Sequence, residues 1–225
     1  IRDRDTRINV KLKSGQETEI NAPGPKVTHA QFEQLLSQIR RTTNDDIVIV
    51  AGSVPNSIPS DAYAQIAQIT EKTGAQLVVD AEKDLVETVL PYRPLFIKPN
   101  KDELEVMFNT TVKSDEDVIK YGKEILKKGA QSVIISLGGD GAIYVDQHQS
   151  IKAVNPQGHV VNTVGSGDST VAGMVAGLSM GLNIDEAFQQ AVASGTATAF
   201  SEDLATRDAI ENIKSQVTIS VLDGE

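Results

Sequence analysis

The first hydrophobic pattern in the chain is a strict alternation close to its start. Polar residues separate Ile8, Val10 and Leu12, and this period of two predicts a strand with one apolar face. Turn-forming residues follow, and residues 18–20 begin a return strand, so the segment predicts a β-hairpin. Because two strands cannot bury an apolar face by themselves, we expect that face to rest on another surface.

From residue 28 onward, helical and strand patterns alternate. The predicted helices cover residues 28–41, 60–74, 84–90, 114–129, 167–181, 184–201 and 207–216, and one more begins at Asn100. Apolar runs at 47–51, 77–80, 95–97 and 132–137 predict buried strands, and residues 142–145 and 150–154 predict a short antiparallel edge. We expect Ser60 to cap its helix, Gly74 to end it, and the helix over 207–216 to be the last element. Repeated strand–helix units predict an α/β fold with a mostly parallel sheet, helices on both faces, and ligands at the carboxyl ends of the strands.

Composition narrows the class of protein. The 225 residues suffice for one domain with a substantial core. Acidic residues number 31 against 21 basic ones, so no basic stripe is available for nucleic acid or an anionic membrane. The absence of cysteine excludes disulfides, thiol catalysis and zinc–cysteine sites. No apolar run approaches the ~18 residues that span a bilayer, so we expect a cytoplasmic protein without a membrane partner.

The strongest chemical signal lies at residues 162–170, Asn-Thr-Val-Gly-Ser-Gly-Asp-Ser-Thr. Gly165 and Gly167 allow backbone N–H groups to approach a ligand closely, and the helix that begins there favours an anion such as a phosphate. Asp168 repels a phosphate, so its presence in the same place indicates proton transfer. An anion-binding loop beside a base is what phosphoryl transfer to a hydroxyl requires.

Two familiar phosphate-binding motifs are excluded here. No Gly-Lys-Ser/Thr follows, so the stretch is not a P-loop, and Thr170 replaces the third glycine of a dinucleotide-binding turn. The short Gly-x-Gly-Asp pattern alone fits a strand-to-helix turn with an aspartate cap equally well. The longer string over residues 162–169 resembles the C-terminal signature of the PfkB/ribokinase-like sugar kinases.

The resemblance implies a ribokinase-like three-layer sandwich with a small β-hairpin lid. It also implies ATP and Mg²⁺ as cofactors, Asp168 as the catalytic base, and an anion hole formed by Gly165, Ser166 and Gly167. Family members carry an earlier segment with a Gly-Gly-Lys-Gly sugar-binding motif, which this chain lacks. We therefore expect the chain to be a fragment that begins inside the family's fold.

Residues 98–103, Lys-Pro-Asn-Lys-Asp-Glu, follow a predicted strand directly. From spacing alone, Asn100 and Glu103 are better explained as a capping box, and the same pattern recurs at Asn183 and Glu186. The string also resembles the family's Lys-Pro-Asn and Asn-x-x-Glu elements. That resemblance implies that Asn100 and Glu103 place Mg²⁺ through water, and that Lys98 lies near the nucleotide phosphates.

Two further segments concern the nucleotide. From spacing alone, residues 136–142 predict a glycine hairpin, and residues 191–199 predict a tightly packed helix. Both resemble parts of the family's ATP site, the loop along ribose and phosphates and the wall of the adenine pocket. The nucleotide-binding residues implied in these segments are Ser136, Leu137, Gly138, Gly139, Asp140, Gly141, Ser194 and Gly195.

Charged residues on an exposed hairpin are usually solvated, yet the opening segment resembles the lid strand of the 1-phosphofructokinase branch of the family. The resemblance implies that Arg7 and Asn9 bind a sugar phosphate, with Ser53 as a second contact. We expect residues 1–25 to form part of the lid and residues 26–225 the α/β kinase core. The apolar stripe of the hairpin predicts a homodimer through the lid; covering strands of the same protein instead is nearly as good an explanation.

These resemblances imply ATP-dependent phosphorylation of the 6-hydroxyl of fructose 1-phosphate, giving fructose 1,6-bisphosphate and ADP. One alternative is a tagatose-6-phosphate kinase of the same family. Another is a sugar-phosphate-binding homologue without catalysis. The histidines at 29, 148 and 159 show no spacing typical of metal ligands, so we expect them at the surface.

Overall fold

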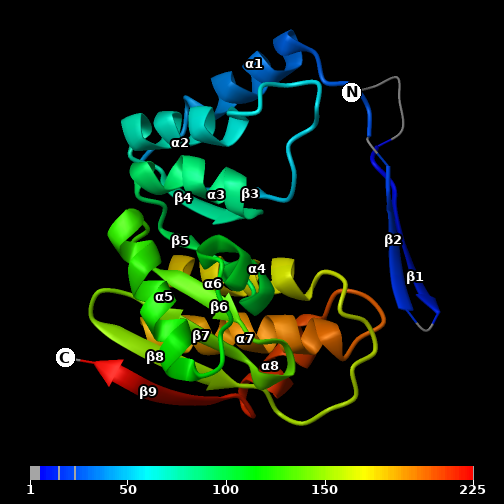
Figure 1. The fold of residues 1–225 in the computed structure, drawn as a ribbon, viewed down its shortest axis with the longest axis vertical. Coiled ribbons are helices and arrows are strands. Elements are labelled where there is room, and N and C mark those ends of the chain that lie inside the picture. Colours follow the sequence, from blue (N-terminus) through cyan, green and yellow to red (C-terminus); the bar gives the residue numbers. More distant parts are fainter. Residues whose placement is uncertain (1–5, 15, 23, 225) are drawn as a thin grey trace.

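A seven-stranded sheet between two layers of helices forms the body of the protein (Figure 1). The structure is a computed structural model, and it describes residues 6–14, 16–22 and 24–224. The sheet has the order β3-β4-β5-β6-β7-β8-β9. Its strands are β3 (Ile47–Ala51), β4 (Gln76–Asp80), β5 (Phe96–Ile97), β6 (Val133–Ser136), β7 (Ala142–Val145), β8 (Gln149–Val154) and β9 (Thr218–Gly224).

The direction of the strands agrees with a mostly parallel sheet. β3 to β6 pair in parallel, and each of the next three strands pairs antiparallel to its neighbour. β8 therefore points the same way as β3 to β6, so their carboxyl ends share one edge of the sheet. That edge is where ligands bind in open α/β sheets.

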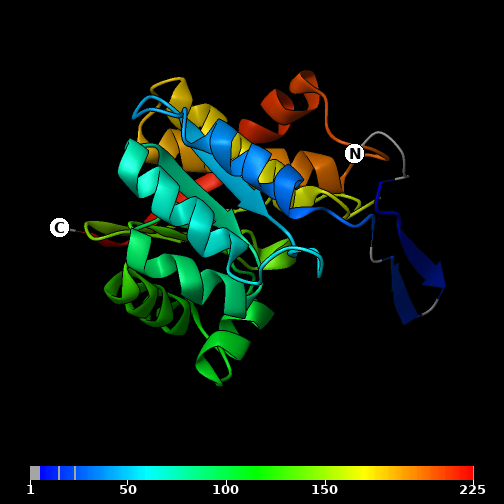
Figure 2. The same ribbon diagram turned by 90° about the horizontal axis from the view of Figure 1, so that it is seen from above.

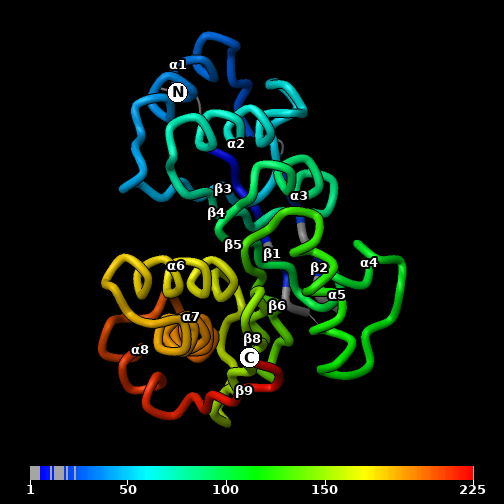
Figure 3. The backbone as a smooth tube through the Cα atoms, turned by 90° about the vertical axis from the view of Figure 1, so that its left-hand side faces the viewer, coloured from blue at the N-terminus to red at the C-terminus, as the bar shows by residue number. Residues whose placement is uncertain are grey.

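Two hydrophobic cores separate the layers. One face of the sheet packs against α1 (His29–Ile39), α2 (Ala62–Thr73), α3 (Lys83–Val89), α4 (Lys101–Phe108) and α5 (Asp115–Lys128). The other packs against α6 (Ser166–Ser179), α7 (Ile184–Ala199) and α8 (Arg207–Lys214) (Figure 3). In β4, Leu77 and Val79 enter the first core and Val78 the second. Because both faces are covered, the strand must be apolar at every one of these positions, as its sequence predicted.

The helix boundaries confirm most of the capping predictions. Asn100 and Asn183 each form a full capping box with the glutamate three residues later. Gly74 ends α2 with a φ of +80°, a left-handed conformation that favours glycine. The prediction for Ser60 was wrong, because Asp61 is the N-cap residue. The Ala62 N–H donates to the Pro59 carbonyl at 3.1 Å, so a backbone turn leads into the helix there.

The end of the chain corrects a second prediction. The helix over 207–214 is not the last element, because β9 follows it and pairs along β8. β7 and β8 are therefore not the edge of the sheet; β9 is. Val217, Ile219 and Val221 alternate with polar residues, which is a strand signal. The prediction that the helix over 207–216 is the last element did not take this alternation into account.

The opening hairpin is confirmed and lies beside the main body. β1 (Asn9–Ser14) and β2 (Gln16–Asn21) pair antiparallel in a sheet of their own and project away from the core (Figures 1 and 2). Val10 lies opposite Ile20 in the register, and both are exposed, as are Ile8 and Leu12. The apolar face that the sequence predicted is thus open to solvent in this chain.

Close packing of α6 on α7 fixes the helix that carries the central motif. A Cβ at Gly173 would lie 2.6 Å from the Ser194 hydroxyl, and one at Gly177 would lie 2.8 Å from the Ala187 Cα. Only glycine permits this approach, so the middle and end of α6 pack closely against α7. No helix in the described parts of the chain is both long and apolar enough to cross a membrane.

Candidate active site

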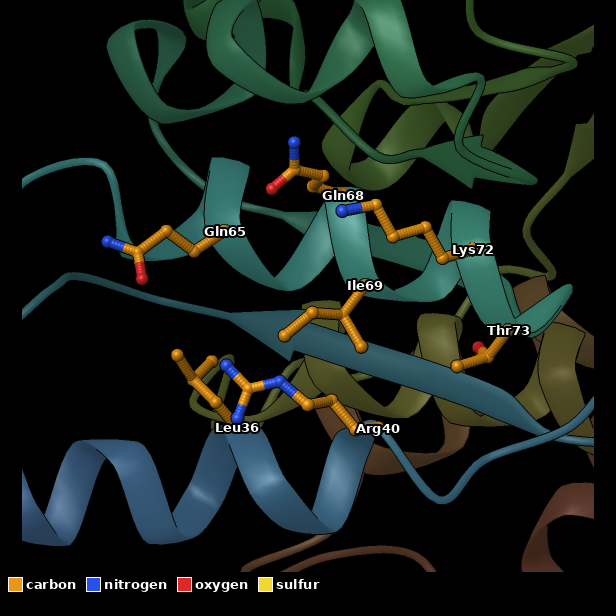
Figure 4. A pocket seen from close by; sticks show the side chains of 7 residues that line it. All are labelled: Leu36, Arg40, Gln65, Gln68, Ile69, Lys72 and Thr73. Carbon is orange, nitrogen blue, oxygen red and sulfur yellow. The ribbon is translucent and has the colours of Figure 1, made fainter.

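A cleft of ≈ 830 Å³ opens at the carboxyl ends of the parallel strands. Residues from the ends of β4 to β6, the start of α6 and the middle of α7 line it. A smaller hollow of ≈ 320 Å³ lies between α1 and α2, where Leu36 and Arg40 face Gln65, Ile69 and Lys72 (Figure 4). Its charged side chains are exposed and no carboxylate lines it. The larger cleft is lined by part of the predicted site, including Lys98, Asn100, Glu103, Ser166, Gly167 and Gly195, whereas Arg7, Asn9, Ser53 and Asp168 lie outside its lining.

The start of α6 has the geometry of an anion site. Gly165 precedes the helix with a φ of +81°, which turns the chain into the first helical residue, Ser166. A Cβ at Gly167 would lie 3.3 Å from the Lys98 ammonium nitrogen, so the backbone of Gly167 faces that cation directly. The buried Ser166 hydroxyl has no hydrogen-bond partner within the described part of the chain. Such an orphaned group fits a site that is completed by a bound ligand.

Asp168 occupies the first turn of α6, next to Gly167; Gly167 lines the cleft, and Asp168 is not among its lining residues. It is exposed to solvent, and its charge reaches Asp80. The structure therefore places the predicted base one residue beyond the cleft lining, beside the predicted anion hole. A carboxylate in this position is accessible to a substrate hydroxyl.

Lys98 and Asp80 form an ion pair at the floor of the cleft. Lys98 follows β5 directly and is only 7% exposed, while Asp80 ends the neighbouring strand β4. The Lys98 Nζ lies 3.3 Å from an Asp80 carboxylate oxygen. Burial raises the pKa of Asp80, the Lys98 cation opposes this rise, and the charges of Glu103 and Asp168 add to it. Asp80 thus lies among the site's acidic groups.

Sequence reasoning assigned no role to Asp80. The available signal was a carboxylate immediately after an apolar strand, at the edge of a parallel sheet where ligands bind. Lys98 also follows an apolar strand directly, and it was selected because it begins a Lys-Pro-Asn string that resembles a family element. The pairing of the two side chains depends on β4 and β5 being neighbours in the sheet.

Asn100 and Glu103 both line the cleft at the start of α4. The Glu103 N–H donates to the Asn100 side-chain oxygen at 2.8 Å, and the Asn100 N–H donates to the Glu103 carboxylate at 2.8 Å. The capping function is therefore confirmed. Each side chain is held at the cleft wall by the bonds that cap the helix.

The glycine loop after β6 forms the opposite wall. Ser136, Leu137, Gly138, Gly139 and Gly141 line the cleft, whereas the predicted Asp140 is exposed outside the lining. Within α7, Gly195 reaches the cleft. Ser194 is instead buried against Gly173, and its hydroxyl donates to the Gln190 carbonyl at 2.8 Å. Thr196 and Asn155 also line the cleft, and sequence reasoning had not selected them.

The hairpin reaches the core through Arg7. Its Nη1 donates to the Ser53 hydroxyl at 2.8 Å and its Nε to the Ala22 carbonyl at 3.0 Å. The structure thus brings together two of the three predicted sugar-phosphate contacts. Asn9, the third, begins β1 and is exposed.

Tyr63 of α2 holds the loop that carries Ser53, the hydrogen-bond partner of Arg7. Its hydroxyl donates to the Gly52 carbonyl at 3.0 Å, immediately before Ser53. Burial, with a smaller effect of the Asp80 charge, raises the pKa of Tyr63 to about 12. The hydroxyl therefore stays protonated near neutral pH and remains a hydrogen-bond donor.

Replacing Tyr63 by phenylalanine is expected to raise KM for a ligand of the predicted sugar-phosphate contact about threefold and to cost about 1 kcal/mol of stability, since one partly buried hydrogen bond is lost. Steady-state kinetics and urea unfolding measure the two effects. Tyr121→Phe is the matched control, because the Tyr121 hydroxyl shares a hydrogen bond with Thr110 in the loop between α4 and α5. A Tyr63→Phe enzyme with unchanged KM would show that the loop keeps its position without this bond.

A helix start that binds an anion and carries its own carboxylate serves the transfer of a phosphoryl group to a hydroxyl. In an α/β sandwich with a small separate β-hairpin, this arrangement is typical of a phosphotransferase of the carbohydrate-kinase class. Residues 1–209 match the pfkB family of carbohydrate kinases, and the chain belongs to this family. Members of the family are ATP-dependent phosphotransferases.

Individual relatives agree with this membership. The chain is 42% identical over 218 residues to a 1-phosphofructokinase of Bacillus subtilis (strain 168), covering 97% of this chain and 72% of the relative. It is 34% identical to a D-tagatose-1-phosphate kinase of Bacillus licheniformis, covering 96% and 72%. A crystal structure described as a phosphofructokinase from Staphylococcus aureus superimposes with a TM-score of 0.90 at 82% identity, covering 99% of this chain and 73% of the other.

Proposed function

We propose that the protein transfers the γ-phosphoryl group of ATP to the 6-hydroxyl of fructose 1-phosphate, giving fructose 1,6-bisphosphate and ADP. The observation that carries the proposal is the position of Asp168, one residue from an anion-binding glycine that faces Lys98. The choice of sugar is supported by the 1-phosphofructokinase relative. The protein is proposed to act in the cytoplasm, because its proposed substrates, ATP and a sugar phosphate, are metabolites of that compartment.

Each side chain has a distinct task in the proposed reaction. Asp168 accepts the proton of the attacking hydroxyl as the phosphoryl group is transferred. The backbone N–H groups of residues 165–167 stabilise charge on the transferred group, because they are already oriented when the substrate arrives. Lys98 adds a buried positive charge on the same side. The glycine loop after β6 and Gly195 bind the nucleotide.

A water-mediated Mg²⁺ site fits the residues at the wall of the cleft. Asn100 and Glu103 offer oxygen atoms there, with Asp80 nearby. No cluster of three or more potential ligands for direct coordination occurs among the described residues. Mg²⁺ keeps several waters when it binds, so sparse protein ligation suits it. When bound, the ion neutralises charge on the phosphates.

We expect Glu103→Gln to raise the Mg²⁺ concentration needed for half-maximal activity at least ~10-fold, the scale seen when a partner of a metal site is lost. Glutamine preserves an oxygen for the Asn100 N–H, so the helix cap survives. Glu186→Gln is the matched control, because it changes the same capping box on α7. An unchanged Mg²⁺ requirement would leave Glu103 with the capping function alone.

We also propose that residues 1–25 act as part of a lid and that two lids form the contact of a homodimer. The exposed apolar residues Val10, Leu12 and Ile20 would pack on a second copy. Arg7 and Asn9 would face the sugar phosphate, with Arg7 positioned by Ser53. A contact between identical hairpins is self-complementary, as a two-fold dimer requires.

Val10→Lys is expected to convert the dimer to a monomer and to raise KM for the sugar phosphate, because a buried unpaired charge breaks an apolar contact. Sedimentation and steady-state kinetics of the full-length protein measure both effects. Val106→Lys makes the same change at an exposed position of α4 and should alter neither. A folded, dimeric Val10→Lys protein with wild-type KM would refute the lid contact.

The proposed function is tested by the full-length protein with ATP and Mg²⁺ against a panel of phosphorylated ketohexoses. Fructose 1-phosphate should give the highest kcat/KM, ahead of tagatose 1-phosphate and the 6-phosphates of fructose and tagatose. A preference for tagatose 6-phosphate would establish the alternative within the family. Binding of these sugars without turnover would establish a sugar-phosphate sensor.

A further inference from the structure

One asparagine joins the two walls of the cleft. Asn155 directly follows β8, between the glycine loop after β6 and helix α7. Its side-chain nitrogen donates to the Gly138 carbonyl at 3.0 Å and approaches the Gly139 carbonyl at 3.4 Å. Its side-chain oxygen accepts a hydrogen bond of 2.9 Å from the Thr196 hydroxyl. Both ends of one amide are therefore used, and each binds a different wall.

The two walls differ in how firmly they are held. A Cβ at either Gly138 or Gly139 would meet no atom within 4 Å, so packing does not fix the loop at these positions. α7, in contrast, is packed against α6 through Gly173 and Gly177. The hydrogen bonds of Asn155 thus connect a loosely packed loop to a rigid helix.

We propose that Asn155 is a positioning residue for the nucleotide, which sets the width of the cleft between the glycine loop and Thr196. The proposal rests on the proposed function, because that function assigns this part of the cleft to ATP. An amide is required in this position, since it must donate to carbonyls on one side and accept from a hydroxyl on the other. Aspartate has the same shape, but an acceptor oxygen replaces the donor nitrogen, so a negative charge faces those carbonyls.

Asn155→Asp is expected to raise Kd and KM for ATP about tenfold, which corresponds to ~1.4 kcal/mol of binding free energy. We expect kcat and KM for the sugar phosphate to stay within about twofold, because Asn155 touches neither the start of α6 nor the lid. Binding of Mg²⁺-ATP by calorimetry and steady-state kinetics provide the measurements. A merely structural role would not raise KM for ATP alone while leaving kcat and KM for the sugar phosphate unchanged.

Gln131→Glu is the matched control. The Gln131 side-chain nitrogen donates to the Arg93 carbonyl at 2.9 Å, far from the cleft, so the same exchange of amide for carboxylate occurs there. Its KM for ATP should equal that of the wild type. If both variants raise KM for ATP equally, the effect does not belong to Asn155 and the proposal is overturned.

Thr196→Val supplies a second test that leaves Asn155 in place. Valine preserves the shape of threonine but removes the hydroxyl, so KM for ATP should rise by about threefold. If Asn155→Asp does not fold, Thr196→Val tests the proposal instead. An unchanged KM for ATP in Thr196→Val overturns it. A wild-type protein that fails to bind ATP removes the proposed function itself. Wild-type turnover together with an unaffected Asn155→Asp enzyme contradicts the positioning role alone.

Discussion

Replacement of Asp168 by asparagine is expected to lower kcat by ~10² or more, the scale of a lost general base. Asparagine has the same shape but cannot accept the hydroxyl proton. The affinities for ATP and for the sugar phosphate should stay within a few-fold, because the glycines and Lys98 that face the anion are unchanged. Steady-state kinetics and equilibrium binding of both substrates separate these effects.

Asp208→Asn is the control for this variant. Asp208 is an exposed aspartate in the first turn of α8, so the substitution removes the same favourable charge from a helix start. It should leave kcat unchanged. Near-normal turnover of the Asp168→Asn enzyme would remove Asp168 from the role of base and would require another carboxylate, such as Asp80, in its place.

The second large effect is expected for Lys98→Met. Removal of one partner from a buried ion pair costs about 3–5 kcal/mol, since the other charge remains without compensation. Lys98 is 7% exposed and the Asp80 side chain 18%, so water screens the pair only weakly. We also expect kcat/KM to fall at least ~100-fold, because the cation that faces Gly167 is lost. Urea unfolding and kinetics measure the two losses.

The loss of stability in Lys98→Met should depend on pH. Burial already raises the folded-state pKa of Asp80 above its ordinary value of 3.8, and removal of the Lys98 cation raises it further. A raised pKa means that the neutral carboxyl is favoured in the fold. Its contribution to stability is complete below the ordinary value and is lost as pH rises through the raised value. The variant should therefore be less destabilised at about pH 5 than at about pH 8.

A double variant distinguishes stability from function. Lys98→Met/Asp80→Asn leaves no unpaired charge, so it should recover most of the stability that Lys98→Met loses. It should recover none of the activity. If Lys98→Met alone keeps wild-type stability and kcat, the ion pair has neither role.

Local sequence signals predicted most of the elements and several of the site residues. The capping box at Asn100, the left-handed glycine at Gly74 and the apolar run 77–79 of β4 each depend on residues adjacent in sequence. Such signals are readable because the physical cause lies within a few positions along the chain. The glycines and Asp168 at the start of α6 are likewise a local signal, because they are adjacent in sequence.

What the sequence did not yield depends on contacts between distant segments. Asn155 bonds a loop 17 residues before it and a helix 41 residues after it. Asp80 meets Lys98 only because their strands are neighbours in the sheet. Ser194 and Gly195 differ in the direction they face on α7, and the packing of that helix against α6 decides which one reaches the cleft. No local pattern specifies these outcomes.

Phosphorus NMR of the full-length protein mixed with ATP, Mg²⁺ and fructose 1-phosphate tests the central claim most directly. The account predicts that the ATP signals convert to those of ADP while a second phosphomonoester appears on C6 of the sugar, and that Asp168→Asn abolishes this conversion on the same timescale. Binding of both compounds with no new sugar phosphate, or release of inorganic phosphate alone, would contradict it.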